Sequence, residues 1–511
     1  MILQFSLILL GILLRVAGYH FDLSSFYNQK FEYVTPFTSF DNLIEAVHLM
    51  SHGTSPYGGS HFHLPPIYLW LFRWVDQDSY SNWGLRIIFI LIDLICCLLL
   101  FLIIKQTLLQ QKNKMLKQKL ERILPVAISS IYFLNPFTIT SCLVYCMGNF
   151  TRLYILLSIY FAMNANLVLT TFVLSLAAYT EVTPVLLIIP MILYCIKQRS
   201  QLFKSKLNIS KLNINKNQEK EKEKEQKQKE EKEEKQKKVK KNQKQKKEKK
   251  TKQNNNKEKQ QNNSKIYLQW FFGLFLFFFW WALLLILSQL MFNSNITNIK
   301  TLTKDPNFFQ HFFSNSHYFT FLKHTYYFLL NITDLTPNIG LYWYLLTETF
   351  VVFRQFLVFT LQFINVVGLI PLTLRFHSYP LFLLAIITSS ITILKAYPTL
   401  ADFPFLFCLL VMQPKLLENT RYRTFFIRGF QVVIGLLSPF YKIWIQDGTG
   451  NANYLFGISL SFSFAEILVL MEMIRSAMIV ITNEKDKKKE KNSKPYYIST
   501  PNKKLHSKKD K

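Results

Sequence analysis

The sequence alternates between long apolar runs and polar segments, and the lengths of the apolar runs predict helices that cross a membrane. A helix needs about 20 mostly apolar residues to span the hydrocarbon core of a bilayer. We expect membrane helices at about residues 2–18, 84–104, 123–143, three within 150–196, 266–292, 340–374, 379–396, 400–413, one ending near Ile445, and 454–482. The pattern therefore predicts an all-α polytopic membrane protein with about twelve transmembrane helices.

The polar segments between these runs differ in charge, and the difference predicts the side of the membrane on which each lies. Basic residues concentrate in segments 105–122, 197–265, 415–428 and 484–511. An even number of spans with a cytosolic N-terminus puts all four on the cytosolic side, as the positive-inside rule requires. The lumenal side then receives three loops, residues 19–82, 293–338 and 446–453.

Composition divides the chain into two apolar parts separated by a charged tract. Residues 1–199 form a predicted N-terminal membrane bundle that includes the first lumenal loop, 19–82, and residues 266–483 form a C-terminal bundle. Between them, residues 200–265 are rich in Lys, Glu, Gln and Asn and lack a hydrophobic period, so we expect a disordered cytosolic insertion. Residues 484–511 form a basic cytosolic tail.

The formal net charge of +29 raises the possibility of nucleic-acid binding, but its distribution argues against this function. Residues 204–265 hold 24 Lys and 10 Glu, and residues 485–511 hold 11 Lys and 3 acidic residues. Neither tract interleaves basic residues with aromatic ones in the manner of a base-reading surface. We therefore assign most of the positive charge to solvated cytosolic segments.

Local signals at the N-terminus and at the cysteines further narrow the class of membrane protein. The apolar run 2–18 is not followed by an Ala-x-Ala-like cleavage site, so we expect an uncleaved signal-anchor helix. The cysteines lie in or beside apolar runs, without a Cys-x-x-Cys pair, and we expect neither a disulfide framework nor a zinc site. They are Cys96, Cys97, Cys142, Cys146, Cys195 and Cys408.

The most information-rich stretch runs from Asp334 to Phe350. Pro337 disfavours helical geometry at the residue before it, and Asn338 and Gly340 tolerate turn geometry. Apolar and aromatic residues then continue to about Leu374, interrupted by Glu348 and Arg354. The stretch therefore predicts a lumenal turn that leads into one long membrane helix carrying two buried charges.

A second polar stretch, residues 446–453, also precedes a long apolar run on the predicted lumenal side. Its asparagines flank a helix start, where an amide caps backbone N–H groups or faces the phosphate and hydroxyl groups of a lipid headgroup. We predict that the two stretches converge on one headgroup-binding groove, with Glu348 and Glu466 lining a polar cavity. The candidate binding residues are Asp334, Asn338, Trp343, Glu348, Asn451 and Asn453.

Five motifs in chain order give the sequence a family resemblance. They are Ser55-Pro-Tyr-x-Gly-x-x-Phe-His63, Leu134-Asn-Pro-Phe-Thr-Ile139, Asp334-Leu-Thr-Pro-Asn-Ile-Gly-Leu-x-Trp-Tyr344, Tyr397-Pro-Thr399 and Gly450-Asn-Ala-Asn453. Over roughly residues 30 to 470 the chain resembles the PIG-U family, a family of membrane subunits of the GPI transamidase.

The resemblance implies a non-catalytic subunit, without a cofactor, that helps recognise or hold the GPI lipid in the endoplasmic reticulum membrane. Its partners would be the other transamidase subunits. A transamidase needs a Cys nucleophile and a His base in a polar setting. Because every cysteine here lies in or beside an apolar run, the nucleophile is expected in another subunit, which the resemblance implies is a caspase-like partner.

The first lumenal loop leaves an enzymatic alternative open, because Ser55-Pro-Tyr57 also resembles the first loop of lumenal mannosyltransferases with a GT-C-like bundle. Those enzymes need paired carboxylates there. At the expected place only Asp41 is present, with Glu45 one helical turn later, while Asp76-Gln-Asp78 lies at the far end of the loop. We therefore predict a mannosyltransferase-like bundle that has lost its catalytic carboxylates.

Two further possibilities carry less weight. His61 and His63 can lie on one side of an extended segment, but zinc needs a third ligand at a defined position, which no spacing provides. A transporter is disfavoured because no paired internal repeat is visible in the sequence.

Overall fold

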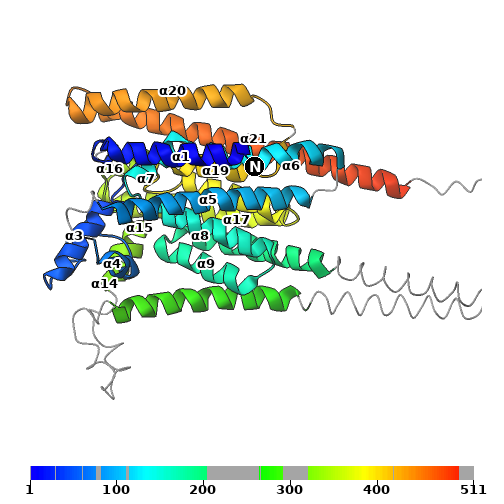
Figure 1. Ribbon diagram of the computed structural model, residues 1–511, viewed down its shortest axis with the longest axis horizontal. Coiled ribbons are helices and arrows are strands. Elements are labelled where there is room, and N and C mark those ends of the chain that lie inside the picture. The colour runs from blue at the N-terminus through cyan, green and yellow to red at the C-terminus, as the bar shows by residue number, and fades with distance from the viewer. Residues whose placement is uncertain are drawn as a thin grey trace, which may run out of the picture.

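The computed structural model describes residues 2–203, 264–291 and 320–493, apart from residues 29, 60, 76–81, 111–113, 265 and 418. Within these residues the chain forms helices and no strand, which confirms the all-α prediction. The long helices run side by side along the long axis of the molecule (Figure 1). One end of this bundle carries α3 (Phe40–Ser51), α16 (Tyr342–Glu348) and the turn before α21 (Ala452–Ser493). We call it the lumenal end, after the predicted topology.

Five helices in the described ranges are long and apolar enough to cross a membrane, or six if one bent pair forms a single span. They are α1 (Ile2–His20), α5 (Trp83–Leu109), the helices Thr183–Phe203 and Ile266–Met291, and α17 (Val351–Phe376). These helices confirm a polytopic membrane protein. Length and composition do not confirm the predicted count of about twelve spans.

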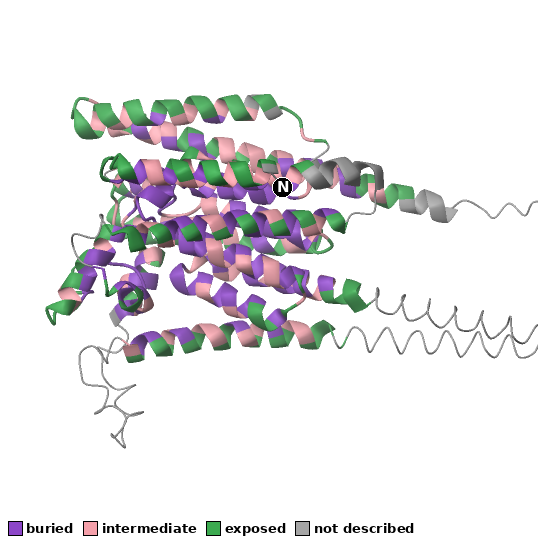
Figure 2. Ribbon diagram, viewed as in Figure 1, coloured by how far each residue is buried: buried purple, intermediate pink, exposed green. Residues whose placement is uncertain are grey.

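The other apolar helices are shorter than a membrane crossing. Helices α9 (Leu167–Thr180) and α18 (Pro380–Ile393) have 14 residues each, and α19 (Asp402–Val411) has 10. A rise of 1.5 Å per residue makes a 14-residue helix about 21 Å long, against about 30 Å for the hydrocarbon core. These helices and α8 (Gly148–Met163) supply much of the largest buried cluster, as the buried residues of Figure 2 show.

Helix α6 (Lys114–Phe133) and helix α7 (Pro136–Leu143) form the bent pair, with 46° between them. The bend follows from Asn135-Pro136, which the sequence predicts to interrupt the run. Proline has no N–H to continue the helix, and the Asn135 side chain accepts the backbone N–H of Phe137 at 2.9 Å instead. Residues before and after the break therefore remain hydrogen-bonded.

Helix α1 packs into the bundle through a buried charge. The Arg15 side chain is fully buried and its Nη2 lies 2.7 Å from Asp93 Oδ2 on α5. Arg15 Nη1 also donates to the carbonyl of Phe133 at 2.9 Å, and the guanidinium stacks over the Phe133 ring. A charge within an apolar segment is costly unless it is paired. The pair therefore holds α1 at one rotation against its neighbours.

In its described residues, the first polar loop forms helices α2 (Leu23–Asn28), α3 (Phe40–Ser51) and α4 (Pro66–Phe72). Helix α3 begins after Ser39, whose hydroxyl accepts the Asn42 backbone N–H at 3.3 Å. Both α3 and α4 bury apolar side chains in a second cluster at the lumenal end. The loop is therefore a folded part of the bundle.

The prediction of one long helix over residues 340–374 was wrong. Helix α16 (Tyr342–Glu348) ends, Thr349 adopts an extended conformation, and α17 begins at Val351. The Thr349 hydroxyl donates to the carbonyl of Leu345 at 2.6 Å and so satisfies an acceptor at the end of α16. The break exposes Glu348 at the C-terminal end of α16, so the expectation of a buried charge at this residue was also wrong.

The C-terminal part ends in a helical hairpin of α20 (Arg423–Tyr441) and α21 (Ala452–Ser493), in which α20 packs mainly on α21 at the edge of the bundle (Figure 1). Helix α21 continues past residue 482, where the sequence predicts its end. The remaining short elements are η2 (Thr183–Leu187), α14 (Thr320–Leu322), η3 (Lys323–Tyr327), α15 (Phe328–Asn331), η4 (Pro414–Leu417) and η5 (Lys442–Gln446).

Candidate functional site

Residues 334–340 form a turn that its own side chains stabilise. Asp334 Oδ1 accepts the backbone N–H of Thr336 at 2.8 Å, and Asn338 Oδ1 accepts that of Gly340 at 2.7 Å. A Cβ at Gly340 would lie 2.8 Å from Pro398 Cδ, so a larger residue does not fit there. Asn338 is buried and serves this turn, whereas Asp334 is partly exposed.

Residues 446–453 form the second turn, between η5 and α21. Gly448 has φ +63, a conformation that L side chains rarely adopt. The backbone N–H groups of Thr449 and Gly450 both donate to the carbonyl of Ile443, at 3.0 and 3.1 Å. Asn451 Oδ1 then accepts the N–H of Asn453 at 3.0 Å, which starts α21. Both asparagines are exposed.

The structure brings the two stretches into contact, as the sequence predicts. Trp343 stacks on Trp444 with ring centroids 5.7 Å apart, and Tyr344 stacks on Phe456 at 4.3 Å. The Tyr344 hydroxyl donates to Asn453 Oδ1. We call residues 334–344 and 446–453 together the lumenal lip.

The lumenal lip offers hydrogen-bonding groups beside an apolar wall. The exposed amide groups of Asn451 and Asn453 lie at the start of α21, where unpaired backbone N–H groups favour negative charge. Trp343 is buried, and within the described part of the chain its Nε1 has no hydrogen-bond partner. Phe430, Leu455 and Phe462 pack behind it in a third apolar cluster. This combination suits a ligand with a polar head and an apolar tail.

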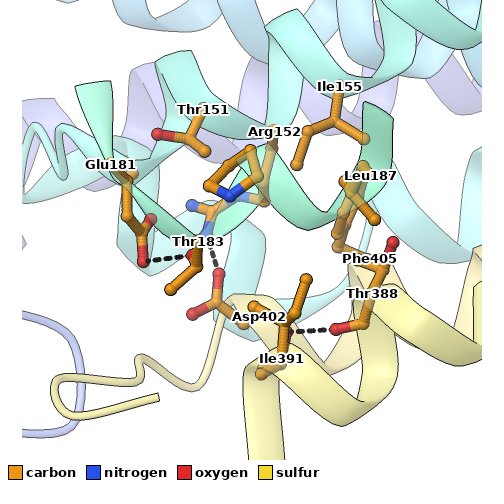
Figure 3. Close-up of a pocket in the computed structure, with 13 residues that line it drawn as sticks. Thr151, Arg152, Ile155, Glu181, Thr183, Leu187, Thr388, Ile391, Asp402 and Phe405 are labelled. Atoms are coloured by element: carbon orange, nitrogen blue, oxygen red, sulfur yellow. Dashed lines mark hydrogen bonds and ion pairs between the residues drawn. The ribbon is translucent and has the colours of Figure 1, made fainter. Parts of the chain in front are cut away.

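The two predicted acidic residues lie at different positions in the bundle. Glu348 is exposed at the end of α16, and its neighbour Phe350 is 81% exposed. Glu466 is half-buried, in the part of α21 that follows Phe462. The residues that line the cavity in Figure 3 include neither of them, and that Glu348 and Glu466 line a polar cavity stays a prediction.

The cavity in Figure 3 contains a charged cluster that sequence reasoning missed. Arg152 Nη1 of α8 lies 2.6 Å from Asp402 Oδ1 of α19 (Figure 3). Just outside the residues that line the cavity, Lys395 Nζ lies 3.1 Å from Glu181 Oε1. Lys395 also approaches Asp402 Oδ2, at 3.5 Å. We call these four residues the charge cluster. The sequence signal for Arg152, Lys395 and Asp402 was a charge within or beside an apolar run.

Further polar groups hold the charge cluster in place. Arg152 Nη2 donates to Ser141 Oγ at 2.9 Å and to Asn149 Oδ1, and the backbone N–H of Thr399 donates to Asp402 Oδ2 at 3.2 Å. The cavity beside the cluster has a volume of about 40 Å³. Because a water molecule needs roughly 10–15 Å³ on this measure, the space suits a few waters. The charges of the two positive and two negative side chains in the charge cluster balance one another. We therefore interpret the cluster as a structural feature of the bundle.

The residues of the enzymatic and metal alternatives make other contacts. Asp41 lies in the first turn of α3 and accepts a hydrogen bond from Asn28. His63 lies with Nδ1 2.8 Å from the His324 carbonyl and stacks on Phe328 at 3.5 Å. Asp76 and Asp78 lie outside the described residues. No group of three metal-binding side chains occurs in the described ranges, and all six cysteines are buried.

Comparisons with known proteins agree on one family. A family model described as GPI transamidase subunit PIG-U matches residues 9–462. The GPI-anchor transamidase component PIGU of Homo sapiens is 23% identical over 483 residues, and that of Cricetulus griseus 24% over the same length, 91% of each chain in both cases. The GPI transamidase component GAB1 of Saccharomyces cerevisiae is 24% identical over 448 residues, 87% of this chain and 86% of the yeast protein.

Proposed function

This chain belongs to the PIG-U family of GPI transamidase subunits, and we propose that within the transamidase it holds the headgroup of the GPI lipid at the lumenal lip. The contact between the two stretches, through the Tyr344 hydroxyl and Asn453, is the observation that carries this proposal, and the stack of Trp343 on Trp444 in η5 lies beside it. It places exposed amides, an indole N–H and a helix start next to aromatic side chains. Phosphate and hydroxyl groups of the lipid suit the amides and the helix start, and its hydrocarbon chains suit the aromatic side chains.

The division of labour in this proposal follows from the side chains present. The chain contributes binding and positioning, and a caspase-like partner subunit contributes the Cys nucleophile and the His base. The buried position of every cysteine and the involvement of His63 in a stacked contact support this division. The partners are the other subunits of the GPI transamidase, and the membrane is that of the endoplasmic reticulum.

The proposed topology keeps the twelve spans of a GT-C-like bundle, with the N-terminus in the cytosol. Short helices such as α9 and α18, which pack on α8 and α17, count as spans in this arrangement. The binding residues are Asp334, Asn338, Trp343, Glu348, Asn451 and Asn453. Of these, Asn338 acts through the shape of its turn, since both polar ends of its amide are used there.

The test is the double variant Asn451→Ala with Asn453→Ala, expressed in cells that lack the native subunit. Losing polar contacts to a ligand costs about 1–3 kcal/mol, roughly a five- to hundredfold loss of affinity. We expect less GPI-anchored reporter at the cell surface, with unchanged co-purification of the other subunits. Asn166→Ala is the matched control, because Asn166 caps α9 at the opposite end of the bundle.

Two outcomes contradict the proposal. If the double variant no longer assembles while Asn166→Ala does, the two asparagines are structural caps. If the double variant assembles and the reporter reaches the surface normally, the headgroup is held elsewhere.

A further inference from the structure

Helix α4 in the first lumenal loop is apolar on its outer face as well as on its inner one. Its inner face buries Tyr68, Leu69 and Phe72. On its outer face and just beyond its end, Trp70, Leu71 and Trp74 are 47%, 42% and 45% exposed. Two exposed tryptophans and a leucine over five positions are unusual for a surface that contacts water.

Hydrogen bonds and ring contacts fix α4 to the body of the bundle. The Tyr179 hydroxyl lies 3.3 Å from the backbone nitrogen of Ile67, and the Tyr68 hydroxyl lies 3.4 Å from Thr180 Oγ1, at the end of α9. The Phe72 ring meets the Phe40 ring edge to face at 5.4 Å. The outer face of α4 therefore has a defined position relative to the membrane spans.

That outer face continues the exposed stripe of the membrane helix α5. The stripe follows one side of α5 through Trp83, Ile87, Leu91, Ile95, Leu98 and Leu102, all exposed. Trp74 lies beside the start of the stripe, 3.8 Å from the position of a Cβ on Gly84. Figure 1 shows α4 almost end-on while α5 runs across the picture, so the axis of α4 is roughly perpendicular to the span.

Helix α3 provides an internal contrast within the same loop. It packs on α4 and also buries one face, but its exposed positions are Asp41, Glu45, His48 and Ser51. In Figure 1 α3 extends beyond the lumenal end of the bundle, whereas α4 lies level with the start of α5. One helix therefore presents a polar surface and its neighbour an apolar, tryptophan-rich one.

From these contacts we propose that α4 lies in the plane of the lumenal leaflet, with Trp70, Leu71 and Trp74 inserted among the phospholipids. Tryptophan concentrates at the boundary between hydrocarbon and headgroups because its ring is apolar and its N–H is polar. The exposed Arg73 stacks over Trp70, and an arginine at this boundary extends its charged end toward lipid phosphates. Since α4 is bonded to the end of α9, its insertion sets the depth of the lumenal end of the bundle in the membrane.

The test uses site-directed spin labelling of the full chain in phosphatidylcholine vesicles. All six native cysteines are buried, so a label added to Leu71→Cys is selective, and the unsubstituted chain measures the background. Leu91→Cys on the α5 stripe is the lipid-facing control, and Glu45→Cys on α3 is the water-facing control. The measured quantity is the collision rate of each label with oxygen, which enters lipid, and with a water-soluble nickel chelate.

We expect the label at residue 71 to collide more with oxygen than with the nickel chelate, as at residue 91, and the label at residue 45 to show the reverse. A nickel-accessible label at residue 71 would overturn the proposal, because the outer face of α4 would then be exposed to water. A label shielded from both reagents would also overturn it, because a protein surface such as a second copy of the chain would then cover α4.

Discussion

Arg152 is the residue that connects the charge cluster to its polar neighbours. It joins Asp402, Ser141 and Asn149, and Asp402 in turn approaches Lys395. Removing charges from water is costly, and their mutual attraction offsets that cost only when the geometry and the surrounding hydrogen bonds are good. The charge cluster therefore selects one arrangement of helices more than it adds net stability.

Replacing Asp402 with Asn tests this account at the level of one side chain. The change leaves two buried cations with one carboxylate between them, and breaking a buried pair typically costs about 3–5 kcal/mol. We expect a lower midpoint of thermal unfolding in detergent, read by loss of the monodisperse peak. The double variant Arg152→Met with Asp402→Leu removes both charges and should lose less than Asp402→Asn; a larger loss would mean that the pair itself stabilises the fold.

Glu32 gives a pH-dependent prediction in the first lumenal loop. Burial raises the pKa of Glu32 above its usual 4.5, so the folded state binds more protons than the unfolded state as pH increases past that value. Stability contributed by this residue is therefore present at low pH and falls as pH rises through the raised pKa. We expect Glu32→Gln to be more stable than the parent at pH 7 and equally stable near pH 4. Glu45→Gln, at an exposed position, is the control, and destabilisation by Glu32→Gln at pH 7 would contradict the account.

At the scale of elements, the break between α16 and α17 decides the shape of the lumenal lip. Because α16 is a separate helix that ends at Glu348, it can take an orientation in which Trp343 and Tyr344 face η5 and the start of α21. The turn before α16 must approach Pro398 closely, which Gly340 permits. The lip thus depends on a close contact between the backbone at Gly340 and the ring of Pro398.

Gly340→Val should disturb this contact. A Cβ there would lie 2.8 Å from both Pro398 Cδ and Asn338 Oδ1, and overpacking of this kind costs about 1–3 kcal/mol. We expect a lower unfolding midpoint and reduced GPI attachment in complemented cells. Gly435→Ala on α20 is the matched control, since nothing lies within 4 Å of its Cβ position and the change should be neutral or slightly stabilising. Equal behaviour of the two variants would show that the 340–398 contact is unimportant.

At the scale of the whole molecule, the two apolar parts of the chain form one core. Its largest cluster includes Leu100 and Leu156 from the first part and Leu384 and Cys408 from the second. The charge cluster likewise joins Arg152 and Glu181 to Lys395 and Asp402. The helix that ends at Phe203 and the one that begins at Ile266 meet the same end of the bundle, opposite the lumenal end (Figure 1).

The Lys-rich tract should therefore be dispensable for assembly. Replacing residues 204–260 with a short Gly/Ser linker removes a segment without an apolar period and keeps the helices on both sides. We expect unchanged membrane insertion and co-purification of the other subunits, measured against the parent chain. Loss of both would show that the tract is a structural part of the protein.

The sequence alone determined what depends on neighbouring residues: the membrane class, the all-α fold, the break at Asn135-Pro136 and the turns at 334–340 and 446–453. It also indicated that the two turns belong together, because both lie on the predicted lumenal side. Only the tertiary structure paired Arg152 with Asp402, 250 positions away, exposed Glu348 and laid α4 across the end of α5. The reason is physical: apolar periodicity and turn chemistry act over a few residues, whereas ion pairs and exposed faces depend on how packed helices are rotated and ordered around one another.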